Sequence, residues 1–129
     1  KLPSQLLLDN TKNLRIVTLG TSNTWGAQLP DRFTEAFPWL LSPNVTNLAE
    51  RASSPSYSAL CIQSMLTEHG TEDHVDVFVL EYVLALDHFD VLTKRLRSRY
   101  PNALIIIVEL WNPAMNVFRT DTNQRSVLW

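Results

Sequence analysis

The residues best suited to chemistry lie in a glycine-flanked segment, residues 20–26, which reads G-T-S-N-T-W-G. Ser22 comes two residues after Gly20, where a β-branched apolar run stops. A serine hydroxyl becomes a nucleophile when a base lies within hydrogen-bond reach and N–H donors face the developing oxyanion. Ser22 is therefore our candidate nucleophile. The alternative is a plain turn in which Ser22 or Thr21 caps the helix that follows.

Chemistry at this segment depends on the elements that hold it in place. Apolar and β-branched runs predict strands at residues 14–19, 45–48, 75–80 and 103–108. Apolar residues at helical spacing predict helices at residues 30–41, 56–70 and 89–100. The first of these helices is expected to be short and imperfect, because Pro38 must either kink it or end a turn there. The alternation predicts an α/β fold with three α/β/α layers and a flavodoxin-like parallel sheet.

The last predicted strand, residues 103–108, reads A-L-I-I-I-V and has no polar position. We therefore expect helices to cover both of its faces, as in other parallel sheets. In open α/β sheets, ligands bind outside the carboxyl ends of the strands, near a reversal of strand order. Because residues 20–26 follow the first strand, they mark the predicted place of the site.

The composition argues against nucleic-acid-binding, disulfide-stabilised, zinc-thiolate and membrane-spanning proteins. The chain has 129 residues, which predicts a single domain. Its 11 Lys and Arg against 13 Asp and Glu give a net charge of −2, so no positive field attracts nucleic acid. One cysteine, Cys61, excludes an internal disulfide and a multi-thiolate zinc site. The longest apolar run is far shorter than the roughly 20 residues that cross a membrane, so no membrane-spanning segment is expected.

Three segments are similar to blocks of one enzyme family. Residues 20–26 resemble the first block of the SGNH (GDSL) hydrolase superfamily, G-D-S-x-[ST]-x-G, with Thr21 in place of the aspartate. Residues 47–52, N-L-A-E-R-A, resemble its second block, N-x-G-x-x-G, with alanine at both glycine positions. Residues 80–87 resemble the segment L-E-[FY]-G-x-N-D that carries the third block, with Ala85 in place of the asparagine.

The resemblance implies a serine esterase with an SGNH-type fold, and O-acyl groups on a carbohydrate or lipid as the substrate class. It makes Ser22 the nucleophile and gives two oxyanion donors, the N–H of Ser22 and the N–H of Ala52. The second block begins at Asn47. The family's third donor is an asparagine side chain, which Ala85 cannot supply. The resemblance implies neither a metal nor an organic cofactor.

Two other interpretations stay open. One is a degenerate, non-catalytic SGNH-like module that binds a carbohydrate or another ligand, and it is motivated by the departures from the family pattern at Thr21, Ala49, Ala52 and Ala85. The other is an acyltransferase that uses the same serine and differs from an esterase only in the acceptor.

The family's acid and base pair reads D-x-x-H, and no aspartate of this chain has a histidine three residues later. We therefore expect the pair, with a further strand and helix, beyond Trp129. On this hypothesis residues 1–129 are the N-terminal portion of one SGNH-hydrolase-like domain that is incomplete at its C-terminus. Expressed alone, they are expected to fold poorly, because the sheet would have an unpaired edge.

Three further residues have two possible roles each. Trp25 lies inside the serine segment and is either a core residue or a platform for a sugar ring or acyl group. Glu81 ends an apolar strand, where a carboxylate either accepts backbone N–H bonds or lines a substrate pocket. His88 follows the third strand and is either a replacement base for Ser22 or a residue at a helix start.

Overall fold

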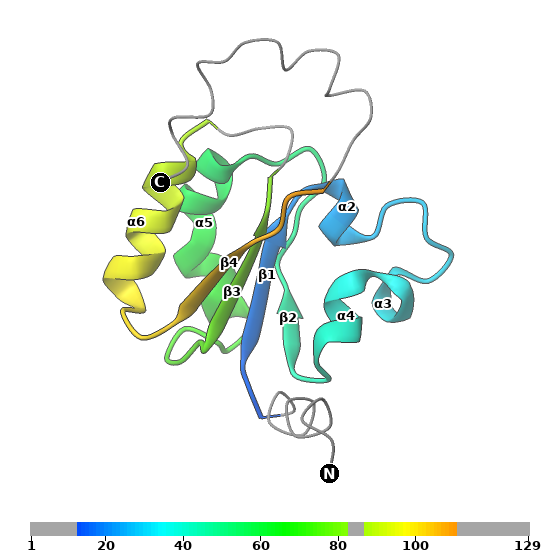
Figure 1. The fold of residues 1–129 in the computed structure, drawn as a ribbon, viewed down its shortest axis with the longest axis horizontal. Coiled ribbons are helices and arrows are strands. Elements are labelled where there is room, and N and C mark those ends of the chain that lie inside the picture. The colour runs from blue at the N-terminus through cyan, green and yellow to red at the C-terminus, as the bar shows by residue number, and fades with distance from the viewer. Residues whose placement is uncertain (1–12, 83–86, 111–129) are drawn as a thin grey trace.

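The computed structural model describes residues 13–82 and 87–110, drawn in colour in Figure 1. Along these residues the chain alternates strands with helices, as the sequence predicts. The strands are β1 (Ile16–Gly20), β2 (Val45–Asn47), β3 (Val77–Glu81) and β4 (Leu104–Ile107). The helices are α2 (Ser22–Trp25), α3 (Arg32–Glu35), α4 (Phe37–Leu41), α5 (Pro55–Glu68) and α6 (Phe89–Arg99).

All four strands pair in parallel, in the order β2-β1-β3-β4. The chain therefore runs outward from β1 to β2 and then returns past β1 to reach β3. The order reverses between β1 and β3, whose register pairs Leu19 with Leu80 and Gly20 with Glu81. A parallel sheet with flanking helices confirms the predicted α/β class.

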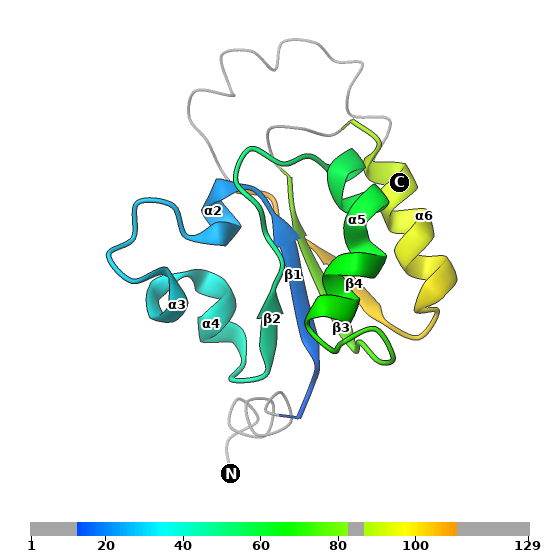
Figure 2. The same ribbon diagram turned by 180° about the vertical axis from the view of Figure 1, so that it is seen from behind.

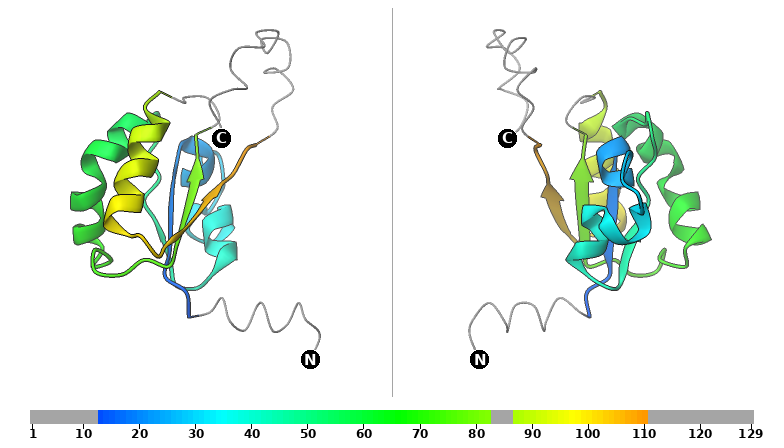
Figure 3. Two further views of the ribbon diagram at one scale, coloured as in Figure 1. Left: turned by 60° about the vertical axis from the view of Figure 1, so that its left-hand side comes forward. Right: turned by 90° about the vertical axis from the view of Figure 1, so that its right-hand side faces the viewer.

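Helices cover the two faces of the sheet unequally. Helices α5 and α6 pack side by side on one face, whereas α3 and α4 lie over the other face next to β2, as Figures 2 and 3 show. The larger core lies under α5 and α6 and includes the fully buried Leu19, Phe78 and Leu92. The smaller core joins the opposite face of β1, β2 and β3 to Phe37 and Trp39. Within the described residues, none of the helices has the length and apolarity to span a bilayer.

The helix predicted at residues 30–41 is wrong in one respect, because the structure has two short helices there. Asp31 caps α3 by accepting a hydrogen bond from the Phe33 N–H at 2.9 Å. The chain then becomes extended at Ala36 (φ −66°, ψ 139°) before α4 begins. Pro38 explains the break, since its ring has no N–H and would collide with the preceding turn of a continuous helix.

The prediction that β4 is covered on both faces is also wrong for the described residues. Leu104 is 57% exposed, Ile106 41% and Ile107 54%. Strand β4 lies at the edge of the sheet, and α3 and α4 lie near the opposite edge, so they do not reach it (Figure 3). Ile105 alone among the four residues of the strand packs against the larger core.

Candidate functional site

Ser22 is the first residue of α2 and lies two residues after Gly20, the last residue of β1. Thr21 precedes it as an extended residue at the N-cap position, and its side chain makes no capping hydrogen bond. None of the described residues hydrogen-bonds to the Ser22 hydroxyl. Neither hydroxyl therefore caps α2, which was the alternative role for this pair.

The serine segment lies where the order of the strands reverses. It leaves the carboxyl end of β1, and the carboxyl end of β3 is its neighbour in the sheet. In Figure 1 both strands end at the same side of the molecule as α2. This is the position at which open α/β sheets bind ligands, because the loops on either side of the reversal separate there.

A buried carboxylate anchors the segment from below. Glu81 is 1% exposed, and its Oε2 accepts hydrogen bonds from the Thr21 hydroxyl at 3.0 Å and the Thr24 hydroxyl at 2.9 Å. The Thr21 N–H also points to this oxygen at 3.4 Å. Charge-assisted bonds of this kind are stronger than those between neutral groups. Two roles were predicted for Glu81, and it has that of a hydrogen-bond acceptor. Its donors are the Thr21 N–H and the hydroxyls of Thr21 and Thr24.

Gly20 allows this close approach between strand and helix. A Cβ atom at Gly20 would lie 2.3 Å from the Thr24 hydroxyl oxygen and 2.8 Å from the Glu81 carbonyl oxygen. Any larger residue would therefore push α2 away from β3. Gly26 ends α2 in the left-handed region at φ 89°, where only glycine is free of strain.

Asn47 ties the same short helix to the neighbouring strands. Its side-chain oxygen accepts hydrogen bonds from the Thr18 hydroxyl at 2.9 Å and the Ala49 N–H at 3.1 Å. Its side-chain nitrogen donates to the Thr24 carbonyl at 2.9 Å. The bonds to Thr18 and Thr24 connect the end of β2 to β1 and α2, so Asn47 fixes the position of the helix that carries Ser22.

The turn at residues 50–53 lies against the start of the serine segment. The Gly20 carbonyl accepts hydrogen bonds from the Glu50 N–H at 3.2 Å and the Ser53 hydroxyl at 3.1 Å. Ala52 is exposed within this turn and has φ 55°, in the left-handed region that favours glycine. A glycine at position 52 would therefore adopt this backbone conformation with less strain than alanine does.

Trp25 forms one wall of a groove of about 330 Å³ that runs beside β2. The walls of the groove include Trp25, Arg32, Phe33, Trp39, Asn47 and Glu50. Trp25 lies three residues after Ser22 on α2, and residues at that spacing are neighbours on one helix face. The Arg32 guanidinium lies 3.9 Å from the centre of the Trp25 ring. Aromatic walls with a few polar groups are typical of small-molecule sites.

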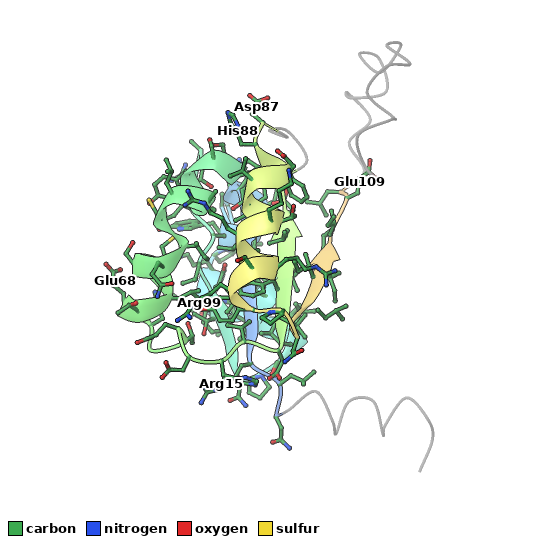
Figure 4. The ribbon with its side chains drawn as sticks, turned by 90° about the vertical axis from the view of Figure 1, so that its left-hand side faces the viewer. Arg15, Glu68, Asp87, His88, Arg99 and Glu109 are labelled. Carbon is green, nitrogen blue, oxygen red and sulfur yellow. The ribbon has the colours of Figure 1, made fainter. Side chains whose placement is uncertain are left out.

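The other predicted site residues are not brought to Ser22 by the described part of the chain. Ala85 lies outside the described residues. His88 is exposed at the start of α6, where Figure 4 shows it with Asp87 at the end of the molecule. Among the described residues, no three His, Cys, Asp or Glu side chains are grouped as a metal site requires.

No protein-family model, curated protein or solved structure matches this chain. The resemblance to SGNH hydrolases therefore depends on the three sequence blocks alone.

Two functional features were missed by sequence reasoning. Thr24 was not singled out, although it fills the [ST] position of the first block and donates to Glu81. Arg32 was also missed, because neither its spacing nor its neighbours in sequence mark it. Its contacts arise from the packing of α3 beside α2, which no local pattern encodes.

Proposed function

We propose that this chain carries the nucleophile of an SGNH-type serine esterase, with Ser22 as the attacking residue. One observation supports this most directly. Ser22 begins a short helix at the reversal of strand order, and a buried carboxylate and Asn47 hold that helix while the Ser22 hydroxyl bonds to no described residue. Such a hydroxyl is fixed in position yet available to an incoming carbonyl group.

The proposed chemistry is acyl transfer to Ser22 and then to water. The Ser22 oxygen attacks the ester carbonyl carbon, and its proton passes through a general base to the leaving alcohol. Water then attacks the acyl-serine and releases the acid. The described residues place no base at Ser22, so the mechanism requires one from elsewhere in the intact protein.

Two backbone N–H groups are suited to the oxyanion. The N–H of Ser22 lies in the first turn of α2, where helical N–H groups have no acceptor within the helix. The N–H of Ala52 donates to none of the described residues, and its turn is bonded to Gly20. A preorganised donor of this kind contributes about 2.7–4 kcal/mol to the transition state.

Hydrolysis of 4-nitrophenyl acetate by the intact natural protein tests the proposal. Ser22→Ala is expected to lower kcat/KM at least 1,000-fold, an order of magnitude typical of a lost nucleophile. Ser98→Ala, at an exposed position on α6, is the matched control and should retain wild-type activity. Wild-type activity in Ser22→Ala would refute the assignment.

A second candidate function is a binding module without turnover. It is favoured by the absence of a base at Ser22 among the described residues and by the aromatic groove beside α2. On this alternative, neither the wild-type protein nor Ser22→Ala hydrolyses esters, and both bind the same ligand with the same affinity. Ester hydrolysis that depends on Ser22 would exclude it.

A further inference from the structure

Arg32 is a cationic residue of the groove that contacts two aromatic rings and, among the described residues, pairs with no carboxylate. The centre of its guanidinium lies 3.9 Å from the Trp25 ring centre and 4.3 Å from the Phe33 ring centre. The side chain is half-buried. None of the described residues accepts a hydrogen bond or forms an ion pair with it. A guanidinium has five N–H donors in a rigid plane, so these donors remain available to a ligand.

The carboxylates nearest in sequence do not neutralise this charge. Asp31 uses one oxygen to cap α3 and the other to accept a hydrogen bond from the Thr34 hydroxyl at 2.8 Å. Glu35, on the same helix, is exposed and forms no ion pair among the described residues. Arg51 adds a second positive charge 5.4 Å from the Trp25 ring centre. The groove therefore has a positive end at Trp25.

The groove also has room and surfaces for a ring. Its volume is about 330 Å³, within the range of small-molecule sites. Trp25, Phe33 and Trp39 supply aromatic faces, and the rings of Phe33 and Trp39 lie 6.5 Å apart. Glu50 lies in the same wall, which disfavours a ligand with two negative charges.

We propose that this groove binds a carboxylate-bearing ring compound, namely a sugar acid, whose carboxylate pairs with the Arg32 guanidinium. A planar guanidinium matches a carboxylate with two parallel hydrogen bonds. Arg32 lies over the rings of Trp25 and Phe33, so the face of the sugar ring packs against Trp39, over which none of the described guanidinium groups lies. The assignment of this sugar acid as the substrate rests on the proposed function, since Ser22 would cleave an ester carried by the same molecule.

Binding of glucuronate and glucose, measured by titration calorimetry on the intact protein, tests the proposal without any ester. The two sugars differ in the carboxylate, so glucose should bind at least about tenfold more weakly. Arg32→Lys keeps the charge but loses the planar fork, and it should weaken glucuronate binding by about tenfold. Arg97→Lys, at an exposed position on α6, is the matched control and should bind as the wild type does.

Phe33→Leu provides a second variant, which keeps the charge of Arg32 but removes one of the two rings that its guanidinium contacts. Phe33 is 61% exposed, so its replacement leaves the fold intact, and loss of the ring contact should also weaken glucuronate binding. Equal binding of glucose and glucuronate, or unchanged binding in Arg32→Lys, would overturn the proposal. Inorganic phosphate binding as tightly as glucuronate would overturn it too, because the groove would then recognise charge alone.

The same titration separates this proposal from the esterase. Ser22→Ala should bind glucuronate as tightly as the wild type, because Ser22 is not a wall of the groove. Glucuronate binding without esterase activity would refute the proposed function, and the groove would remain a sugar-acid site. Esterase activity without glucuronate binding would refute the sugar-acid site, and Ser22 would remain the proposed nucleophile.

Discussion

At the scale of single residues, residues 20–26 are held in position by hydrogen bonds to the side chains of Glu81 and Asn47. Glu81 is 57 positions away from Thr24 in the sequence, yet their side chains form a buried hydrogen bond at 2.9 Å. The hydroxyls of Thr21 and Thr24 both donate to this carboxylate, so the two threonines hold the segment against β3.

Thr24→Val should destabilise the protein by about 1.5–3 kcal/mol, because the isosteric side chain deprives a buried carboxylate of one donor. Urea unfolding measures the loss. Thr34→Val is the matched control, since its hydroxyl bonds to an exposed carboxylate of Asp31, and it should change stability by less than about 0.5 kcal/mol. Equal losses in the two variants would contradict the account of Glu81 as an anchor.

Ala52→Gly should be neutral or stabilise the fold by up to about 1 kcal/mol. A non-glycine residue in the left-handed region costs about 1–2 kcal/mol, and the greater freedom of glycine in the unfolded chain offsets part of the gain. Ala49→Gly is the comparison, because Ala49 is buried and has no positive φ, so it should lose stability. Thermal unfolding of both variants measures the difference. A clear loss in Ala52→Gly would contradict the strain at this position.

The position of Ser22 could be anticipated from the sequence, because glycines and a preceding apolar strand mark the loop locally. The residues that support it could not. Glu81 and Asn47 reach the loop only after β1, β2 and β3 have paired, and their partners are set by that register. Glu81 was recognised as a strand end, but both its roles remained open until its donors were known.

At the scale of elements, Tyr82 connects the end of β3 to the beginning of α5. Its hydroxyl hydrogen-bonds with the Ser58 hydroxyl inside the larger core. Burial raises the pKa of Tyr82 to about 12, because the phenolate would lose its solvation. Helix α5 and the strand that ends beside the candidate site are therefore joined by a neutral tyrosine.

This raised pKa predicts a pH dependence of stability. Since the pKa is higher in the folded protein than the ordinary value of 10, the contribution of Tyr82 is fully present below pH 10. It is lost as the pH rises from about 10 to about 12, by about 2–3 kcal/mol. Tyr82→Phe should be less stable than the wild type at pH 8, and the gap should narrow above pH 10. Urea unfolding at pH 8, 10 and 12 measures it, and a constant gap would contradict the assignment.

The alternation of strands and helices was predictable because periodicity and length distinguish the two. The separation of α3 from α4 was harder to predict, because a proline such as Pro38 permits either a kinked helix or two separate helices. The prediction that helices cover both faces of β4 was wrong, because an apolar sequence shows only that burial of the strand would be favourable. It does not show which helix, if any, packs on each face. Which element reaches each face depends on topology, and α3 and α4 lie across β2.

At the scale of the whole molecule, the described residues form a sheet whose central strands are buried and whose edge strand β4 exposes apolar side chains. Strands β1 and β3 are buried along their length, whereas β4 exposes Leu104, Ile106 and Ile107. Exposed apolar edge strands pair readily with other chains. We therefore expect the exposed side chains of β4 to promote self-association of the chain.

Ile106→Lys should reduce self-association of the 129-residue chain while changing its stability by less than about 1 kcal/mol, because the side chain is 41% exposed. Val79→Lys is the contrast, since Val79 is buried in the smaller core and a lysine there should prevent folding. Gel filtration and far-UV circular dichroism give the two readouts. A folded, monomeric wild-type chain would contradict the role of the β4 edge.

The central claim is that Ser22 is a nucleophile, and the most direct measurement is the site of covalent modification. The intact protein is treated with a fluorophosphonate, digested, and mapped by mass spectrometry. The account predicts one phosphonylated residue, Ser22, with no adduct in Ser22→Ala and an unchanged adduct in Ser98→Ala. An adduct on another residue, or no adduct in the wild-type protein, would contradict the claim.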